Sequence, residues 1–138
     1  MRDIALNFSV MKMSRYSHYN ANPTNSRVGD CVIRAIAKAL EKPWEDTYID
    51  LCIQGFIMGD LPSSNAVWSA YLKHKGFKRS TINDCPDCYT VEDFCKDHPN
   101  GVYVIGTGSH AVAVLDGNVF DAWNSLRETP VYYFEKEK

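Results

Sequence analysis

The sequence lacks any long hydrophobic run and any block of charge of one sign. None of its segments approaches the roughly 18 consecutive apolar residues of a membrane span, and no apolar run of signal-peptide length follows Met1. Fifteen basic and seventeen acidic residues leave a formal net charge of -2. Because nucleic acid is bound by basic surfaces, we expect no nucleic-acid partner. Because the sequence has no long apolar segment, we expect no membrane partner and a cytoplasmic location.

Internal repeats, low-complexity tracts and linkers are also missing from the sequence. The 138 residues are 45% hydrophobic and 12% aromatic, as in packed globular proteins. A chain of this length matches the commonest size of a single domain. We therefore expect residues 1–138 to form one domain, whose oligomeric state the sequence leaves open. Aromatic residues at helical spacing are expected in its core: Trp44, Tyr48, Trp68 and Tyr71.

Apolar residues at helical spacing predict that the chain is mostly helical as far as residue 100. A buried helix is expected over 31–40, with Asp30 as its N-cap and with Arg34 and Lys38 on its wetter face. Residues 14–28, before this helix, are polar and turn-rich. Three further helices are predicted: from Pro43 to near Gly59, from Ser64 or Asn65 to Gly76, and a short one that Thr90 and Asp93 cap and 99–101 closes.

From Val102 onward the pattern changes to that of β-strands, which we expect at 102–105, 110–115, 118–123 and 131–134. Asp116 and Gly117 lie between two apolar runs and predict a hairpin with a two-residue loop. Helices followed by neighbouring strands indicate an α+β domain with an antiparallel sheet.

Cys31 stands at the first turn of the predicted helix 31–40. A thiolate there interacts with the positive end of the helix dipole, and such sites can lower the pKa of a cysteine into the range of about 3.5 to 7.5. The thiol could then act as a nucleophile at neutral pH. The alternative is that Cys31 is a small buried apolar side chain, as free cysteines commonly are.

The predicted hairpin brings a histidine and a carboxylate together. With a two-residue loop, Val112 opposes Asp121 and His110 opposes Trp123, so these four side chains share one face. His110 and Asp121 are then diagonal neighbours, and Trp123 shields the pair from water. An imidazole that a carboxylate orients, placed against a thiol, is the arrangement for nucleophilic acyl transfer. The alternative is a structural hydrogen bond on a solvated sheet face.

Three short motifs resemble those of papain-like cysteine peptidases. Residues 109–114, Ser-His-Ala-Val-Ala-Val, are similar to their histidine strand, and residues 121–123, Asp-Ala-Trp, to their asparagine-x-tryptophan, with aspartate in place of asparagine. Residues 29–31, Gly-Asp-Cys, resemble the nucleophile at the head of their central helix, and the Asp-Cys pair resembles that of bacteriocin-processing peptidases. The chain also resembles short phage and Firmicutes proteins that carry Gly-Asp-Cys-Val-Ile-Arg-Ala.

The resemblance implies a papain-like fold in which the helix headed by Cys31 packs on the C-terminal sheet. It implies hydrolysis of a peptide or isopeptide bond in a peptide or protein substrate, with no cofactor. In this reaction Cys31 attacks the carbonyl, His110 transfers the proton and Asp121 orients His110. Asn25, six residues before the cysteine where the family has a glutamine, would stabilise the oxyanion together with the Cys31 amide. Val32 stands where the family has a tryptophan.

Two other functions remain open at this point. Transglutaminases use the same three residue types, so the acyl group could pass to an amine rather than to water. A papain-like module without catalysis, such as a phage protein that binds a host factor at the old cleft, would retain the three residues as packing.

The remaining cysteines allow a different interpretation. Cys85, Cys88, Cys95 and His98 form a C-x2-C-x6-C-x2-H pattern whose ligand types suit a structural zinc ion, as in a small zinc-stabilised adaptor. Redox chemistry of the Cys-x-x-Cys pair and ordinary packing are the alternatives. Because the chain has five cysteines and thiols stay reduced in the cytoplasm, we interpret all of them as thiols. Cys52 is assigned no role.

Overall fold

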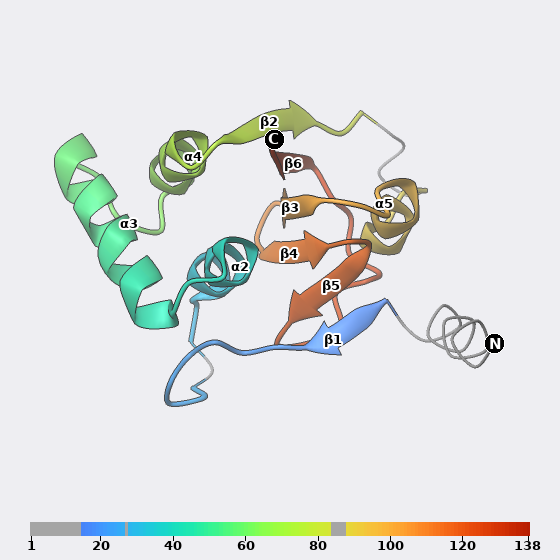
Figure 1. Ribbon diagram of the computed structural model, residues 1–138, viewed down its shortest axis with the longest axis horizontal. Coiled ribbons are helices and arrows are strands. Elements are labelled where there is room, and N and C mark those ends of the chain that lie inside the picture. Colours follow the sequence, from blue (N-terminus) through green and yellow to red (C-terminus); the bar gives the residue numbers. More distant parts are fainter. Residues whose placement is uncertain (1–14, 27, 84–87) are drawn as a thin grey trace.

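The computed structural model describes residues 15–26, 28–83 and 88–138 (Figure 1). In these residues four helices and a six-stranded sheet form a mixed fold, which confirms the predicted α+β class. The strand order is β1-β5-β4-β3-β6-β2, and all neighbours are antiparallel except β1 and β5. The elements are β1 (Tyr16–His18), α2 (Cys31–Leu40), α3 (Trp44–Met58), α4 (Asn65–His74), β2 (Phe77–Thr81), α5 (Val91–Asp97), β3 (Val102–Gly106), β4 (Ala111–Leu115), β5 (Asn118–Asp121) and β6 (Tyr132–Lys136).

The hairpin between β4 and β5 has the predicted two-residue loop. Asp116 and Gly117 both have positive φ angles, of 49° and 76°, as a type I′ turn requires. Leu115 therefore pairs with Asn118, and the register continues from there along both strands. The strands are shorter than predicted at their far ends, so His110 and Trp123 lie just outside them.

The sequence pattern does not predict the two edge strands, β1 and β2. β1 lies in the segment 14–28, which was expected to form turns, and β2 follows the third predicted helix. In β2 only Phe77 is buried, so this strand lacks the alternation of apolar and polar residues that marks a half-buried strand. Backbone pairing with β5 and β6, which are distant in sequence, makes these segments strands.

The predicted helix ends are largely confirmed. α3 follows Pro43 and ends at Gly59, whose φ of 71° is left-handed. α5 has the predicted capping box, in which the side chains of Thr90 and Asp93 each accept from the other residue's backbone amide. Among the described residues, no helix is both long and apolar enough to cross a bilayer.

Helices cover both faces of the sheet (Figure 1). α2, α3 and α4 lie on one side, where Ile36, Trp68 and Phe134 belong to one apolar cluster. α5 lies on the other side, where Phe94 and Val112 belong to a second cluster. α2 is the central helix, because it packs against β3, β4 and β5 and also against α3.

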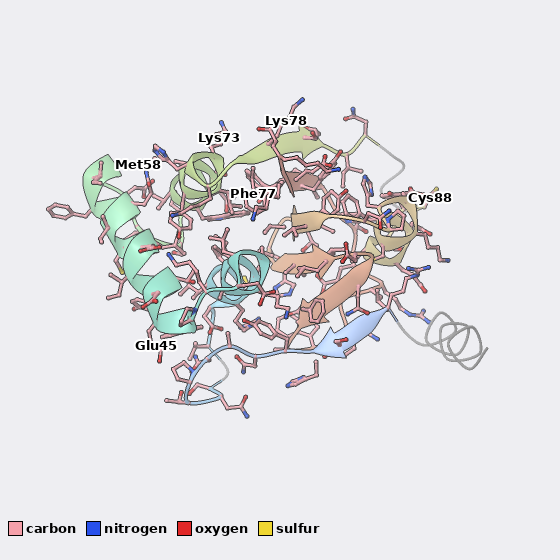
Figure 2. All side chains as sticks on the ribbon, viewed as in Figure 1. Glu45, Met58, Lys73, Phe77, Lys78 and Cys88 are labelled. Atoms are coloured by element: carbon pink, nitrogen blue, oxygen red, sulfur yellow. The ribbon has the colours of Figure 1, made fainter. Side chains whose placement is uncertain are left out.

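Burial corrects the predicted environment of two side chains. Arg34, predicted on the wetter face of α2, is 4% exposed, because the sheet and α3 enclose this helix on more than one side. Tyr48, predicted in the core, is 44% exposed, whereas Trp68 is buried as expected. Tyr48 belongs to α3, which lies at the periphery of the molecule, with Glu45 and Met58 near its two ends (Figure 2).

Candidate active site

Cys31 is the first residue of α2, at the N-terminal end of the central helix. Its thiol is partly buried and lines a cavity together with His110 and Ala111, which lies at the start of β4 and, like His110, lowers the pKa of the thiol. The sulfur also lies beside the helix N-terminus, where the first-turn amides have no partner within the helix. These surroundings favour the thiolate, because two donors and the helix dipole stabilise negative charge.

His110 lies one residue before β4 and is 9% exposed. Its Nε2 atom is 2.7 Å from Oδ2 of Asp121, which is the contact predicted from the hairpin register. Because Nε2 is occupied by the carboxylate, Nδ1 is the ring nitrogen that remains for the thiol of Cys31. Trp123 stacks on the imidazole with 4.3 Å between ring centroids and covers one face of the ring, as expected.

The thiol and the imidazole shift each other's ionisation. Burial lowers the pKa of His110, but hydrogen bonds to Asp121 and Cys31 and the charges of both raise this pKa to about 9. Burial raises the pKa of the Cys31 thiol, but hydrogen bonds from His110 and Ala111 and the charges of His110 and Arg34 hold this pKa below its ordinary value. The surroundings therefore stabilise the pair as thiolate and imidazolium.

Asp121 is 2% exposed, so its carboxylate depends on protein groups for its hydrogen bonds. Besides the contact with His110, the hydroxyl of Ser125 donates to Oδ2 at 2.7 Å and the amide of Ala122 donates to Oδ1 at 2.7 Å. Burial raises the pKa of Asp121, but the bonds from His110 and Ser125 hold this pKa below its ordinary value. The ionised carboxylate is thus held in one orientation, from which it can fix the tautomer of His110.

The sequence does not predict the buried ionic network behind these three residues. Arg34, one turn along α2 from Cys31, pairs with Asp30 through Nη1, and its Nη2 lies 3.6 Å from Oδ1 of Asp121. The guanidinium carbon also lies 5.7 Å from the centroid of the Trp123 ring. The i, i+4 spacing of Asp30 and Arg34 is the signal that could have identified the pair.

Asp30 precedes α2 as predicted, but its side chain does not cap the helix amides. Its Oδ2 accepts from Nε1 of Trp44 at 2.9 Å and from Nδ2 of Asn22 at 3.2 Å, and its Oδ1 is paired with Arg34. A buried guanidinium without a carboxylate partner would be strongly destabilising. The carboxylate of Asp30 therefore pairs with Arg34 instead of capping the backbone amides of α2. Asp30 therefore connects α2 with α3 and with the segment before α2.

The structure does not place Asn25 with the other predicted site residues. Asn25 is exposed in the turn before α2 and has a left-handed φ of 55°. Its Oδ1 accepts from Nδ2 of Asn20 at 3.2 Å. Its neighbours Thr24 and Ser26 line the cavity beside Cys31, but Asn25 does not. A part for Asn25 in stabilising an oxyanion stays a prediction.

A cavity of about 690 Å³ adjoins both Cys31 and His110. Its volume is in the range of sites that bind drug-sized ligands, roughly 300 to 1,000 Å³. Residues of α2, α3, α4 and β6 contribute its walls, so the cavity occupies the side of the sheet on which α2 lies. A substrate in this cavity would meet the thiol and the imidazole together.

The chain matches no family model, no curated protein and no solved structure. The geometry of Cys31, His110 and Asp121 is therefore the basis for a functional assignment. A thiolate, a proton donor beside it and a buried carboxylate that orients the donor can together carry out nucleophilic acyl transfer.

The residues of the predicted zinc pattern lie in different surroundings. Cys85 lies outside the described residues, and Cys88 is exposed. Cys95 is fully buried in the second apolar cluster, and burial raises its pKa to about 12. His98 stacks on Phe94 at 3.9 Å and donates from Nδ1 to the carbonyl oxygen of Phe94 at 3.0 Å. Within residues 15–26, 28–83 and 88–138, no three His, Cys, Asp or Glu side chains form a group that could hold a metal ion.

Gly106, at the end of β3, supports one wall of the cavity. A Cβ atom at this position would come within 2.1 Å of the ring of Tyr132, which lines the cavity. We expect Gly106→Ala to displace this ring and to destabilise the protein by about 1 to 3 kcal/mol, as overpacking does. Urea unfolding measures the change in the free energy of unfolding.

Gly29→Ala is the control for this substitution. A Cβ atom on Gly29 meets no atom within 4 Å, so its effect should stay below about 0.5 kcal/mol. Removing the ring in the double variant Gly106→Ala, Tyr132→Ala should make the added methyl group harmless relative to Tyr132→Ala alone. Equal stability of Gly106→Ala and the unmodified protein would contradict the close contact with Tyr132.

Proposed function

We propose that the chain is a papain-like thiol hydrolase, which cleaves a peptide or isopeptide bond in a peptide or protein substrate through a thioester at Cys31. The main support is the 2.7 Å contact between His110 and the buried carboxylate of Asp121, together with the cavity that Cys31 and His110 both line. The position of Cys31 at the start of a central helix that packs on β4 agrees with the motifs that resemble the papain-like peptidases. In the proposed reaction, the bonds are made and broken and the protons are transferred by these side chains and water.

In the first half of the proposed reaction the thiolate of Cys31 attacks the substrate carbonyl carbon and forms a C–S bond. The resulting tetrahedral intermediate collapses as the C–N bond breaks. The Nδ1–H of His110 gives its proton to the leaving nitrogen, which departs as an amine. A thioester on Cys31 and a neutral His110 remain.

In the second half His110 accepts a proton from water as the water oxygen attacks the thioester carbonyl carbon. Breakage of the C–S bond releases a carboxylic acid and restores the thiolate of Cys31, next to a protonated His110. Asp121 keeps Nε2 protonated throughout, so that Nδ1 is the nitrogen that exchanges protons with the reacting groups. The initial state of the site is thereby restored.

The negative charge that develops on the carbonyl oxygen requires hydrogen-bond donors. The backbone amide of Cys31, at the N-terminus of α2, is the donor that the helix position favours. The Asn25 amide remains the second proposed donor, and it would have to leave its contact with Asn20 to reach the substrate.

Alkylation by iodoacetamide at different pH values tests this proposal. For an ordinary thiol, with a pKa of about 8.5, the fraction present as thiolate falls more than roughly 100-fold between pH 9 and pH 6. We expect the alkylation rate of Cys31 to fall much less over this range, because its surroundings lower the pKa of the thiol. Mass spectrometry of the peptides that contain Cys31 and Cys52 gives both rates from one sample.

Cys52 is the internal control, because it lines the same cavity and has no hydrogen bond to an imidazole among the described contacts. The rate of Cys31 should fall less than the rate of Cys52 between pH 9 and pH 6. If Cys31 and Cys52 have the same pH profile, the hydrolase proposal fails and the binding module becomes the better account of the chain.

A further inference from the structure

The cavity beside Cys31 has mainly aromatic and aliphatic walls. Trp44 and Tyr48 from α3 form one aromatic pair, with 5.0 Å between ring centroids. Trp68 from α4 and Tyr132 from β6 form a second pair, with 6.1 Å between centroids. Leu51 and Trp68 also line the cavity and are each 1% exposed, so their side chains are tightly packed. Such surfaces bind aromatic rings through stacked or edge-to-face contacts.

Away from Cys31 and His110, the cavity offers no free counter-charge for a charged ligand. Its described lining residues include no lysine, arginine or glutamate, and Asp30 is the only carboxylate among them. Both oxygens of Asp30 are already engaged, by Arg34, Trp44 and Asn22. A charged side chain that entered this part of the cavity would lose water without gaining an ion pair.

The polar groups of the cavity can bind a peptide backbone. The carboxamide oxygen of Asn65 accepts from Nε1 of Trp68 at 3.0 Å, which leaves its NH2 group as a donor toward a ligand. Ser63 and Ser109 also line the cavity and carry hydroxyl groups. Polar groups of this kind orient a ligand whose apolar part supplies most of the binding.

We propose that this cavity selects substrates with a large uncharged side chain, preferably an aromatic one, within two residues of the carbonyl that Cys31 attacks. This inference rests on the proposed hydrolase function, because it uses the same nucleophile. It adds that bulky apolar residues next to the cleaved bond are accepted and that lysine, arginine, aspartate and glutamate are excluded. Tyr48 is the selecting residue most accessible to experiment, since it lines the cavity and is half exposed.

A series of dipeptidyl chloromethyl ketones tests the selection. A cysteine thiolate displaces chloride from the carbon next to the ketone carbonyl of these probes and forms a C–S bond. The two side chains of the probes can be varied among Phe, Leu, Gly, Lys and Glu. We expect Phe-containing probes to label Cys31 at least about tenfold faster than probes with Lys or Glu, a ratio within what an apolar pocket achieves. Equal rates for the Phe, Lys and Glu probes would overturn the inference.

Variants of α3 locate the selection in the cavity. Tyr48→Ala should slow labelling by the Phe probes several-fold, and Tyr48→Phe should keep the rate near that of the unmodified protein. Phe56→Ala is the matched control, because Phe56 lies on the same helix, is 87% exposed and does not line this cavity. If Tyr48→Ala and Phe56→Ala behave alike with the Phe probes, the cavity does not select the side chain.

Iodoacetamide separates this inference from the function on which it rests. This small reagent has no side chain to place in the cavity, so its rate reports the thiolate alone. High reactivity of Cys31 with iodoacetamide at pH 6, combined with no preference among the peptide probes, would refute the selection and leave the hydrolase proposal standing. An ordinary pH profile with iodoacetamide would refute the hydrolase proposal itself.

Discussion

Replacing His110 with alanine is expected to lower the rate of substrate hydrolysis by about 10²- to 10⁴-fold, the usual contribution of a general acid and base. The same substitution should raise the pKa of Cys31, because both the hydrogen bond and the positive charge of the imidazole lower it. The iodoacetamide rate of Cys31 should then fall as steeply with decreasing pH as that of an ordinary thiol. Both changes follow from the loss of one side chain, and they are measured independently.

The pKa shifts of His110 and Cys31 also predict how hydrolysis by the unmodified protein depends on pH. The pKa of His110 is raised to about 9, so the imidazolium that protonates the leaving amine persists through neutral pH and is lost above about pH 9. Because the pKa of Cys31 is lowered, the decline of the hydrolysis rate toward acid pH should occur at a lower pH than the pKa of an ordinary thiol. Hydrolysis should therefore decline above about pH 9 and below the lowered pKa of Cys31, and give the bell-shaped profile of a reaction that needs one acid and one base.

His98→Ala is the control for His110→Ala. His98 is also a partly buried histidine, but it stacks on Phe94 at the end of α5, on the other side of the sheet. Its loss should leave both the iodoacetamide profile of Cys31 and the hydrolysis rate unchanged. If His110→Ala alkylates with the same pH profile as the unmodified protein, the imidazole does not control the thiol and the mechanism is wrong.

Replacing Arg34 with methionine is expected to destabilise the protein by about 3 to 5 kcal/mol, the usual cost of removing one partner from a buried ion pair. Arg34 is 4% exposed and lies between the carboxylates of Asp30 and Asp121, so its loss leaves the buried Asp30 without a positive partner and leaves Asp121 with His110 alone. Urea unfolding at neutral pH measures the change in the free energy of unfolding. A change below about 1 kcal/mol would contradict the network.

A second measurement separates a positioning role of Arg34 from a structural one. The positive charge of Arg34 lowers the pKa of Cys31, so Arg34→Met should shift the iodoacetamide profile of the folded protein toward higher pH. Arg34→Lys keeps the charge but not the planar guanidinium. Its alkylation profile should therefore be close to that of the unmodified protein, whereas its free energy of unfolding should remain lowered. A purely structural arginine would leave the profile of both folded variants in place.

Lys38→Met is the matched control on the same helix. Lys38 lies one turn beyond Arg34, its side chain is 22% exposed, and its carboxylate partner Glu41 is largely exposed at 3.7 Å. Exposed pairs of this kind contribute up to about 1 kcal/mol. Lys38→Met should therefore have a small effect on stability and leave the alkylation profile of Cys31 unchanged.

The local parts of the fold and of the candidate site could be predicted from sequence. Helical periodicity places Cys31 at the first turn of α2, and the loop at Asp116 and Gly117 sets the register that joins His110 to Asp121. Each of these predictions concerns residues close in sequence, whose geometry depends on the backbone periods of 3.6 and 2 residues. The contact between Cys31 and His110 joins distant segments, and it was anticipated through the motifs that resemble a known family.

Other features could not be predicted, because they depend on which surfaces meet. A charged residue is exposed by default, and the packing of α2 between the sheet and α3 buries Arg34. An aromatic residue at helical spacing is buried by default, but Tyr48 faces the cavity on a peripheral helix. The short strand β2 is recognisable through its pairing with β6, and not through its own pattern.

For this chain, short-range patterning was sufficient to specify an α+β fold, a hairpin register and a histidine beside a carboxylate. Long-range packing specified the rest: the enclosed guanidinium of Arg34, the separation of Asn25 from the cavity, and the aromatic walls near Cys31. The division has a physical cause. Backbone geometry acts over a few residues, whereas burial and the partner of a buried charge depend on segments that are far apart in the chain.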